Sequence, residues 1–190
     1  MQRGDYLIAI LRSPKTVFTS KDLAILWQDP GSSATRVRIS YYVNKGDLIR
    51  LRKGLYAKSK NYSKLELATR IFTPAYVSFE TVLAKEGLIF QVYQPIFVAS
   101  YTTRKIHVDN QEYSFKTMKD SILINSLGVE NVNETSIASK ERAFLDTLYV
   151  HNDYYFDNLR SLDWEKVFHI LTIYDNQRMA KKVNQLHQSI

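Results

Sequence analysis

The sequence predicts an α+β protein in which a winged helix-turn-helix precedes an α+β domain with a small antiparallel sheet. Three short helical segments followed by a glycine-containing hairpin, all in the first third of the chain, predict the first part. Strand-like runs lying between further helical segments predict the second part. The 190 residues fit one domain or two small ones, and we place the boundary between residues 1–60 and 61–190.

The first two helices are predicted from apolar spacing and from residues typical of helix ends. Residues 2–12 carry apolar side chains at helical spacing, and Pro14 ends this helix because its predecessor is displaced from the helical region. Thr19 or Ser20 caps the second helix. Asp22 follows Thr19 at the spacing of a capping box.

The third helix has clear signals at both ends. Ser32 or Ser33 caps it, and it runs to Asn44 or Lys45. Gly46 then closes it in the left-handed conformation that glycine adopts readily.

Positive charge is concentrated in this first third. The chain has a net charge of +7, and residues 1–58 contain 11 basic and 4 acidic residues, whereas residues 59–190 contain 15 of each. A basic segment attached to a neutral body is typical of a nucleic-acid-binding module. A solubilising basic face is the alternative.

One side of the third helix is expected to enter the major groove of DNA. Thr35, Ile39, Tyr42 and Val43 fall on the side that would face the first two helices. A helical wheel also allows the reverse orientation, in which Ala34, Val37 and Tyr41 form the buried stripe. The residues expected to contact DNA from this helix are Ser33, Arg36, Val37, Arg38, Ser40, Tyr41, Asn44 and Lys45.

Two arginines of this helix flank its two faces. Arg36 and Arg38 are placed to reach phosphates or base edges, and bidentate pairing of arginine with guanine is the commonest specific contact.

The hairpin over residues 48–57 forms the predicted wing, with Gly54 at its turn. Arg50 and Arg52 share one face of the first strand, and Lys53 lies at the tip. Basic residues on a wing typically contact phosphates, which position a protein without reading sequence. The alternative is a charged edge that prevents pairing with other strands.

The rest of the chain predicts helices and strands in alternation. Helices are expected over residues 63–72, from Ser78 to Gly87, after Ser139, after Asp163 and from Asp175 to His187. Strands are expected over residues 96–101, 105–108, 113–118 and 122–124.

Catalysis, cofactor binding and metal binding are not expected. The chain has no cysteine, and its four histidines are not spaced as metal ligands on one helical turn. The motifs of metalloproteases, serine hydrolases and nucleotide-binding loops are absent from the sequence. No apolar stretch approaches the roughly 20 residues of a membrane span, and no signal peptide is recognisable. We therefore expect a cytoplasmic protein that is not an enzyme.

Three segments resemble the AbiE-type antitoxins (AbiEi family) of bacterial type IV toxin–antitoxin systems. Residues 50–57 (RLRKGLYA) are similar to the RxGxYA end of the family's winged helix. Residues 75–89 are similar to its YxSxxSALxxxGLI segment, with Thr81 and Val82 in place of the usual Ser-Ala. Residues 137–146 (IASKERAFLD) are similar to its IAxxExALLD segment.

The resemblance implies an antitoxin and transcriptional autorepressor of an abortive-infection operon. Its winged helix would bind inverted repeats in double-stranded operator DNA. Its C-terminal domain would counteract a cognate nucleotidyltransferase-like toxin, and the family resemblance does not require a stable toxin complex.

Two other interpretations compete with this one. The first is a solitary winged-helix regulator whose C-terminal domain binds a ligand or a protein. The second is an interaction domain that does not bind nucleic acid. A neighbouring nucleotidyltransferase gene separates the antitoxin from the solitary regulator, and salt-dependent DNA binding separates both from the third class.

Overall fold

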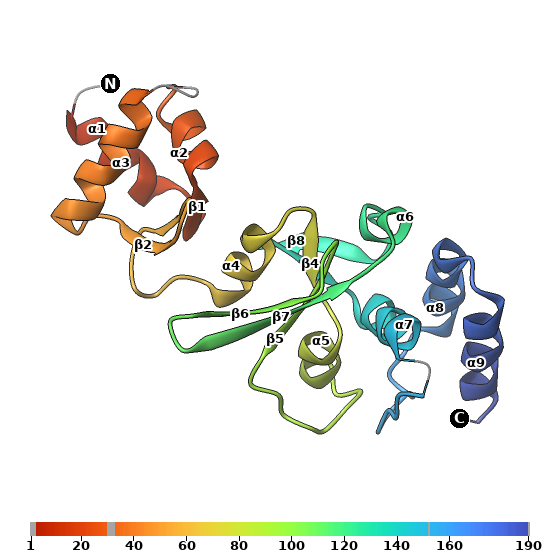
Figure 1. The fold of residues 1–190 in the computed structure, drawn as a ribbon. Helices are drawn as coiled ribbons and strands as arrows, with labels where there is room; N and C mark the ends of the chain where they lie inside the picture. Colours follow the sequence, from red (N-terminus) through yellow and green to blue (C-terminus); the bar gives the residue numbers. More distant parts are fainter. Residues whose placement is uncertain (1–2, 30–32, 152, 190) are drawn as a thin grey trace. The chain divides into compact units, whose positions relative to one another are not determined.

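The chain divides into two compact units in this computed structural model, residues 1–71 and 72–190 (Figure 1). The structure describes residues 3–29, 33–151 and 153–189. Both units contain helices, and each has its own sheet, three-stranded in the first and six-stranded in the second. The predicted α+β class is therefore confirmed. Within the described ranges, no helix is long and apolar enough to cross a membrane.

The first unit is a winged helix-turn-helix followed by one further helix. Its sheet has the order β1-β3-β2, and both pairs of strands are antiparallel. In chain order the elements are α1 (Arg3–Arg12), β1 (Val17–Thr19), α2 (Ser20–Leu26), α3 (Ser33–Lys45), β2 (Ile49–Arg52), β3 (Leu55–Ala57) and α4 (Lys64–Ile71).

The start of α2 and the end of α3 follow the predicted signals. The Thr19 hydroxyl accepts a hydrogen bond from the Asp22 N–H at 3.0 Å, and the Asp22 carboxylate accepts one from the Thr19 N–H at 2.8 Å, which completes the capping box. Gly46 follows α3 with φ of 84°, the left-handed conformation expected there. Of the two predicted caps of α3, Ser33 is already helical and Ser32 lies outside the described residues.

The sequence pattern did not predict β1. This strand has only three residues, too few to show alternation, and it is defined by its pairing with β3. Phe18 on β1 lies opposite Tyr56 and is 1% exposed, so the strand contributes directly to the core. The buried core of the first unit consists of Ile10, Phe18, Leu23, Trp27, Ile39, Tyr42, Leu48 and Tyr56.

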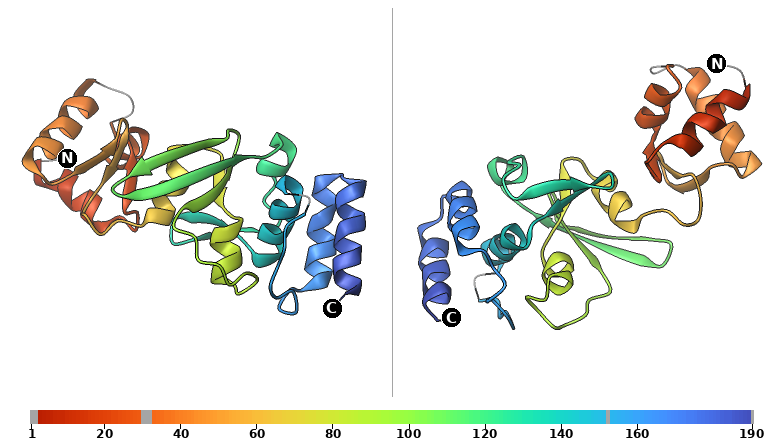
Figure 2. Two further views of the ribbon diagram at one scale, coloured as in Figure 1. Left: turned by 60° about the horizontal axis from the view of Figure 1, so that its bottom comes forward. Right: turned by 180° about the vertical axis from the view of Figure 1, so that it is seen from behind.

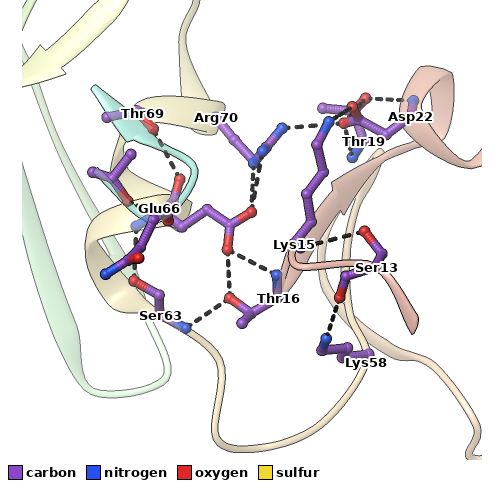
Figure 3. Close-up of polar contacts among 12 residues, drawn as sticks. Ser13, Lys15, Thr16, Thr19, Asp22, Lys58, Ser63, Glu66, Thr69 and Arg70 are labelled. Atoms are coloured by element: carbon purple, nitrogen blue, oxygen red, sulfur yellow. Dashed lines mark hydrogen bonds and ion pairs between the residues drawn. The ribbon is translucent and has the colours of Figure 1, made fainter. Parts of the chain in front are cut away.

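A buried carboxylate joins α4 to the winged helix (Figure 3). Glu66 is 1% exposed and accepts hydrogen bonds from the Thr16 N–H at 2.8 Å, the Thr16 hydroxyl at 2.5 Å and Arg70 Nε at 3.1 Å. The Thr16 hydroxyl in turn accepts from the Ser63 N–H at 2.9 Å. These contacts place α4 in the first unit, which therefore extends past the boundary that we expected at residue 60.

The same network continues to the start of α2 (Figure 3). Asp22 pairs with Lys15 Nζ at 2.6 Å and with Arg70 Nη1 at 3.3 Å, so one carboxylate receives two cations and the capping bond from Thr19. Burial raises the pKa of Asp22, but hydrogen bonds from Lys15 and Thr19 and the charge of Arg70 together hold it below its ordinary value. Asp22 therefore stabilises the fold as a carboxylate.

The second unit is built on a mixed sheet, whereas we expected a small antiparallel one. The strand order is β6-β7-β5-β4-β9-β8, in which β5 with β7 and β4 with β9 are parallel and the other pairs antiparallel. The strands are β4 (Ala75–Val77), β5 (Ile96–Ser100), β6 (Arg104–Val108), β7 (Gln111–Thr117), β8 (Val129–Val132) and β9 (Thr135–Ala138).

Helices pack against this sheet and against one another (Figure 2). α5 contacts β5 and α7, and α7 contacts β9 and α8. α8 and α9 lie side by side, and the Trp164 ring stacks on His187 with centroids 4.5 Å apart. The helices are α5 (Glu80–Lys85), α6 (Asp120–Leu123), α7 (Lys140–Val150), α8 (Trp164–Leu171), the 3-10 turn η1 (Thr172–Tyr174) and α9 (Gln177–Gln188).

One predicted strand and one predicted helix cap of the second unit are wrong. Residues 122–124 lie in and just after helix α6, because a three-residue apolar run does not distinguish a buried helix from a strand. Ser78 does not cap α5. The cap position is Phe79, and the Ser78 hydroxyl instead donates to Asp146 Oδ2 at 2.7 Å.

Other helix starts in this unit are confirmed or shifted slightly. Ser139 caps α7 by accepting from the Arg142 N–H, and Asp163 caps α8 by accepting from the Lys166 N–H, both at 3.2 Å. The last helix is capped by Asn176, one residue after the predicted start.

Candidate nucleic-acid interface

The outer face of α3 is the face that the helical wheel assigned to DNA. Thr35, Ile39 and Tyr42 are at most 4% exposed, and Val43 packs against the same core. The reverse orientation is therefore excluded. The exposed residues of α3 are Ser33, Ala34, Arg36, Val37, Ser40, Tyr41, Asn44 and Lys45.

The preceding turn fixes α3 against the other helices. The Thr35 hydroxyl donates to the Asp29 backbone oxygen at 2.9 Å, which anchors the first turn of α3 to the segment that follows α2. The Tyr42 and Trp27 rings pack with centroids 5.9 Å apart. The exposed outer face is thus carried on a helix whose inner face packs against the core.

Arg38 is the one predicted contact residue of α3 that is not exposed. Its side chain is 21% exposed, and Nη1 donates to Asp29 Oδ2 at 3.0 Å. The guanidinium lies 3.9 Å from the centre of the Tyr6 ring and 5.4 Å from the Trp27 ring. Arg38 therefore binds α1 and α2 to α3, whereas Arg36 on the other edge is exposed.

The wing presents its basic residues to solvent. Arg50 and Arg52 are exposed and alternate along β2 with the half-buried Ile49 and Leu51, as predicted. Lys53 is exposed at the turn. The pairing of β2 with β3 has a register shift between Arg50 and Arg52, and both arginines are exposed.

The wing tip is tied to the start of α2. The Ser20 N–H donates to the Gly54 backbone oxygen at 3.1 Å, and Gly54 has φ of 81°. A side chain at Gly54 would be strained at this angle and would approach Ser20 Oγ at 3.9 Å. The basic hairpin and the helix-turn-helix therefore form one surface with fixed geometry.

An open groove of about 480 Å³ runs beside α3, and sequence reasoning missed it. Tyr6 from α1 lines it opposite Ala34, Val37 and Tyr41 from α3. The sequence signal that could have indicated the groove is Tyr6 on the apolar face of the first helix. A tyrosine has an apolar ring and a polar tip, so it suits a surface that is only partly buried.

The second unit contains a buried polar cluster around Asp146. Its carboxylate accepts hydrogen bonds from Tyr174 at 2.6 Å, Ser78 at 2.7 Å, and Arg142 Nε and Tyr76 at 3.2 Å. All five side chains are at most 3% exposed. Burial, with the nearby Asp146 charge, raises the pKa of Tyr174 well above its ordinary value, so its hydroxyl remains a donor. The cluster ties α7 to β4 and η1.

A second polar group lies near the end of α7. Lys116 Nζ contacts both Glu80 carboxylate oxygens at 3.0 Å and His151 Nε2 at 3.2 Å. Burial and the Lys116 charge lower the pKa of His151. In the described parts of the chain, no three His, Cys, Asp or Glu side chains are grouped to hold a metal ion.

Comparisons with protein-family models and with curated protein sequences each found no match for this chain. The functional assignment therefore depends on the geometry of the outer face of α3 and the wing, together with the three motif resemblances in the sequence.

Proposed function

We propose that this protein is a DNA-binding transcriptional repressor whose winged helix binds double-stranded operator DNA. The observation that carries the proposal is the surface formed by the exposed face of α3 and the exposed basic wing of β2 and β3. That surface belongs to the segment that holds the whole positive excess of the chain. Phosphates attract such a surface at long range, which favours DNA over a neutral partner.

The dimensions of α3 fit the major groove. Its 13 residues span about 20 Å at a rise of about 1.5 Å per residue. The major groove is about 12 Å wide and admits one helix, whose outer side chains then meet base edges. Arg50, Arg52 and Lys53 lie on the adjacent hairpin, where they would contact phosphates and set the position of α3.

The test is the affinity of the full chain for a fluorescein-labelled duplex of mixed sequence, measured by anisotropy. Replacing Arg50, Arg52 and Lys53 with alanine should weaken binding at 0.1 M salt by two to three orders of magnitude. The reason is that each phosphate contact raises the logarithm of the binding constant by about 0.9 when the salt concentration falls from 1 M to 0.1 M.

The matched control removes three basic residues from α9 in the second unit. Alanine at Arg178, Lys181 and Lys182 changes the net charge by the same amount without touching the winged helix. Equal weakening by both triple variants would show that binding follows net charge alone and would contradict the proposed interface.

We further propose that the second unit counteracts a nucleotidyltransferase-like toxin, without assuming a stable complex. The resemblance of residues 75–89 and 137–146 to AbiE-type antitoxins supports this role. A second support is an exposed apolar surface on two loops, where Phe90, Val92 and Tyr155 are at least 73% exposed. An exposed apolar surface of this kind is typical of a site that contacts another protein.

The two loops are held together by hydrogen bonds that backbone N–H groups donate to a carboxylate and to a backbone oxygen. The Phe90 N–H donates to the Asp157 carboxylate at 2.7 Å, and the Asp157 N–H donates to the Leu88 oxygen at 2.9 Å. The surface is therefore built into the fold. A regulator of this kind works in the cytoplasm on DNA and needs no catalytic site of its own.

Co-expression with a nucleotidyltransferase-like toxin from a gene adjacent to this one tests the antitoxin role. The full chain should restore growth, and the wing variant, whose DNA binding is weakened, should restore it as well. If neither protein restores growth, the antitoxin role is contradicted, and duplex binding by the full chain would then favour a solitary winged-helix regulator.

A further inference from the structure

The centre of the exposed face of α3 is apolar. Ala34, Val37 and Tyr41 follow one another at helical spacing on this face. Val37 is 70% exposed and Tyr41 is 40% exposed. These side chains form the α3 wall of the open groove whose other side is Tyr6.

The cations of α3 lie away from this apolar centre or are engaged by acidic partners. Arg38 is held by Asp29 at 3.0 Å and lies over the Tyr6 ring. Lys45 pairs with Asp47 at 3.0 Å in the last turn. Arg36 is exposed at the edge next to the half-buried Val43. The geometry therefore does not favour arginine–guanine pairing at the middle of the helix.

Polar residues on the exposed face fit adenine. Asn44 is exposed two turns after Val37, on the same side of the helix. Asparagine pairs with adenine through two hydrogen bonds in the major groove. The thymine opposite that adenine presents a C5 methyl, the apolar group of the major-groove edge.

We propose that the stripe of Ala34, Val37 and Tyr41 reads thymine methyl groups, so that the preferred DNA is rich in A·T pairs. The inference rests on the proposed DNA-binding function and names the feature of DNA that its helix recognises. DNA is the occupant that fits the charge, because the stripe belongs to a domain whose wing carries Arg50 and Arg52.

Two pairs of synthetic duplexes test this directly. Alternating poly(dA-dT) and poly(dA-dU) differ only in the thymine methyl, and poly(dG-dC) gains the same methyl when its cytosines carry a C5 methyl. The full chain should bind poly(dA-dT) more tightly than poly(dA-dU), by about fourfold for each methyl that the stripe covers. Methylation of the dG-dC polymer should strengthen binding in the same direction.

The Val37→Ser variant identifies the residue responsible. Val37 is exposed, so this change leaves the core intact, and it should weaken binding to poly(dA-dT) more than binding to poly(dA-dU), which reduces the preference between the two. Val132→Ser, at an exposed valine of β8, is the control and should retain the full preference.

The outcomes separate this inference from the function on which it rests. Salt-dependent binding with equal affinity for poly(dA-dT) and poly(dA-dU) would overturn methyl recognition and leave DNA binding in place. An undiminished preference in Val37→Ser would overturn the role of the stripe. Absence of binding to every duplex at low salt would overturn the proposed function itself.

Discussion

Replacing Glu66 with alanine should destabilise the first unit strongly, because this carboxylate is the buried acceptor between α4 and the residues before β1. Its removal leaves the Thr16 N–H and hydroxyl without their acceptor and takes an acidic partner from Arg70. Breaking a buried ion pair costs about 3–5 kcal/mol. Arg70 is 14% exposed and keeps Asp22, so we expect the lower end, about 3 kcal/mol.

Urea unfolding of the full chain, followed by Trp27 fluorescence, measures this effect. Trp27 lies in the first-unit core, and a Trp164→Phe background removes the other of the two tryptophans. At a slope of about 1.5 kcal/mol per M, a loss of about 3 kcal/mol lowers the midpoint by about 2 M. Glu130→Ala, at an exposed glutamate of β8, is the control. A Glu66→Ala midpoint equal to that of the control would refute the stabilising role of this network.

Three further predictions concern single residues. Asp146→Asn should destabilise the second unit by about 3–5 kcal/mol, measured by unfolding followed at Trp164, because the amide puts a donor against the donors around it. The lowered pKa of Asp22 contributes stability that is present above about pH 4 and lost as the pH falls further, so Asp22→Asn should flatten the acid limb of first-unit stability. Arg38→Ala should cost about 1–2 kcal/mol of first-unit stability through its ring and ion-pair contacts, with no selective loss for one DNA sequence.

In the first unit, local sequence signals predicted those structural features that depend on residues close together in the chain. The capping residues of α2, the glycine after α3 and the alternation along β2 act within a few residues. Spacing left two orientations of α3 open, and the burial of Thr35, Ile39 and Tyr42 decides between them. β1 and the attachment of α4 depend on partners far along the chain, such as Thr16 and Glu66, which are 50 residues apart.

In the second unit too, the sequence did not predict elements that are defined by distant partners. The strands β5, β6 and β7 are long enough for their sequences to predict a strand. In contrast, β4 has three residues and is defined by its pairing with β5 and β9. The β8–β9 hairpin turns through Asn133 and Glu134, both with positive φ, and the second of these is not a typical turn residue.

The candidate site was predictable in its position but not in the roles of all its residues. The wheel places Arg36 and Arg38 symmetrically, one on each flank of α3. Only the fold shows that Asp29 and Tyr6 engage Arg38 and that Arg36 is exposed. Specific contacts of a long, flexible side chain depend on tertiary neighbours that helical spacing does not reveal.

The salt dependence of duplex binding tests the central claim most directly. The logarithm of the affinity of the full chain should fall linearly with the logarithm of the salt concentration, and Arg52→Ala should flatten the slope by about 1 for every duplex sequence. Lys181→Ala, in the second unit, should leave the slope unchanged. An unchanged slope for Arg52→Ala, or a loss confined to one sequence, would contradict phosphate contact by the wing and with it the proposed docking of α3 and β2 on DNA.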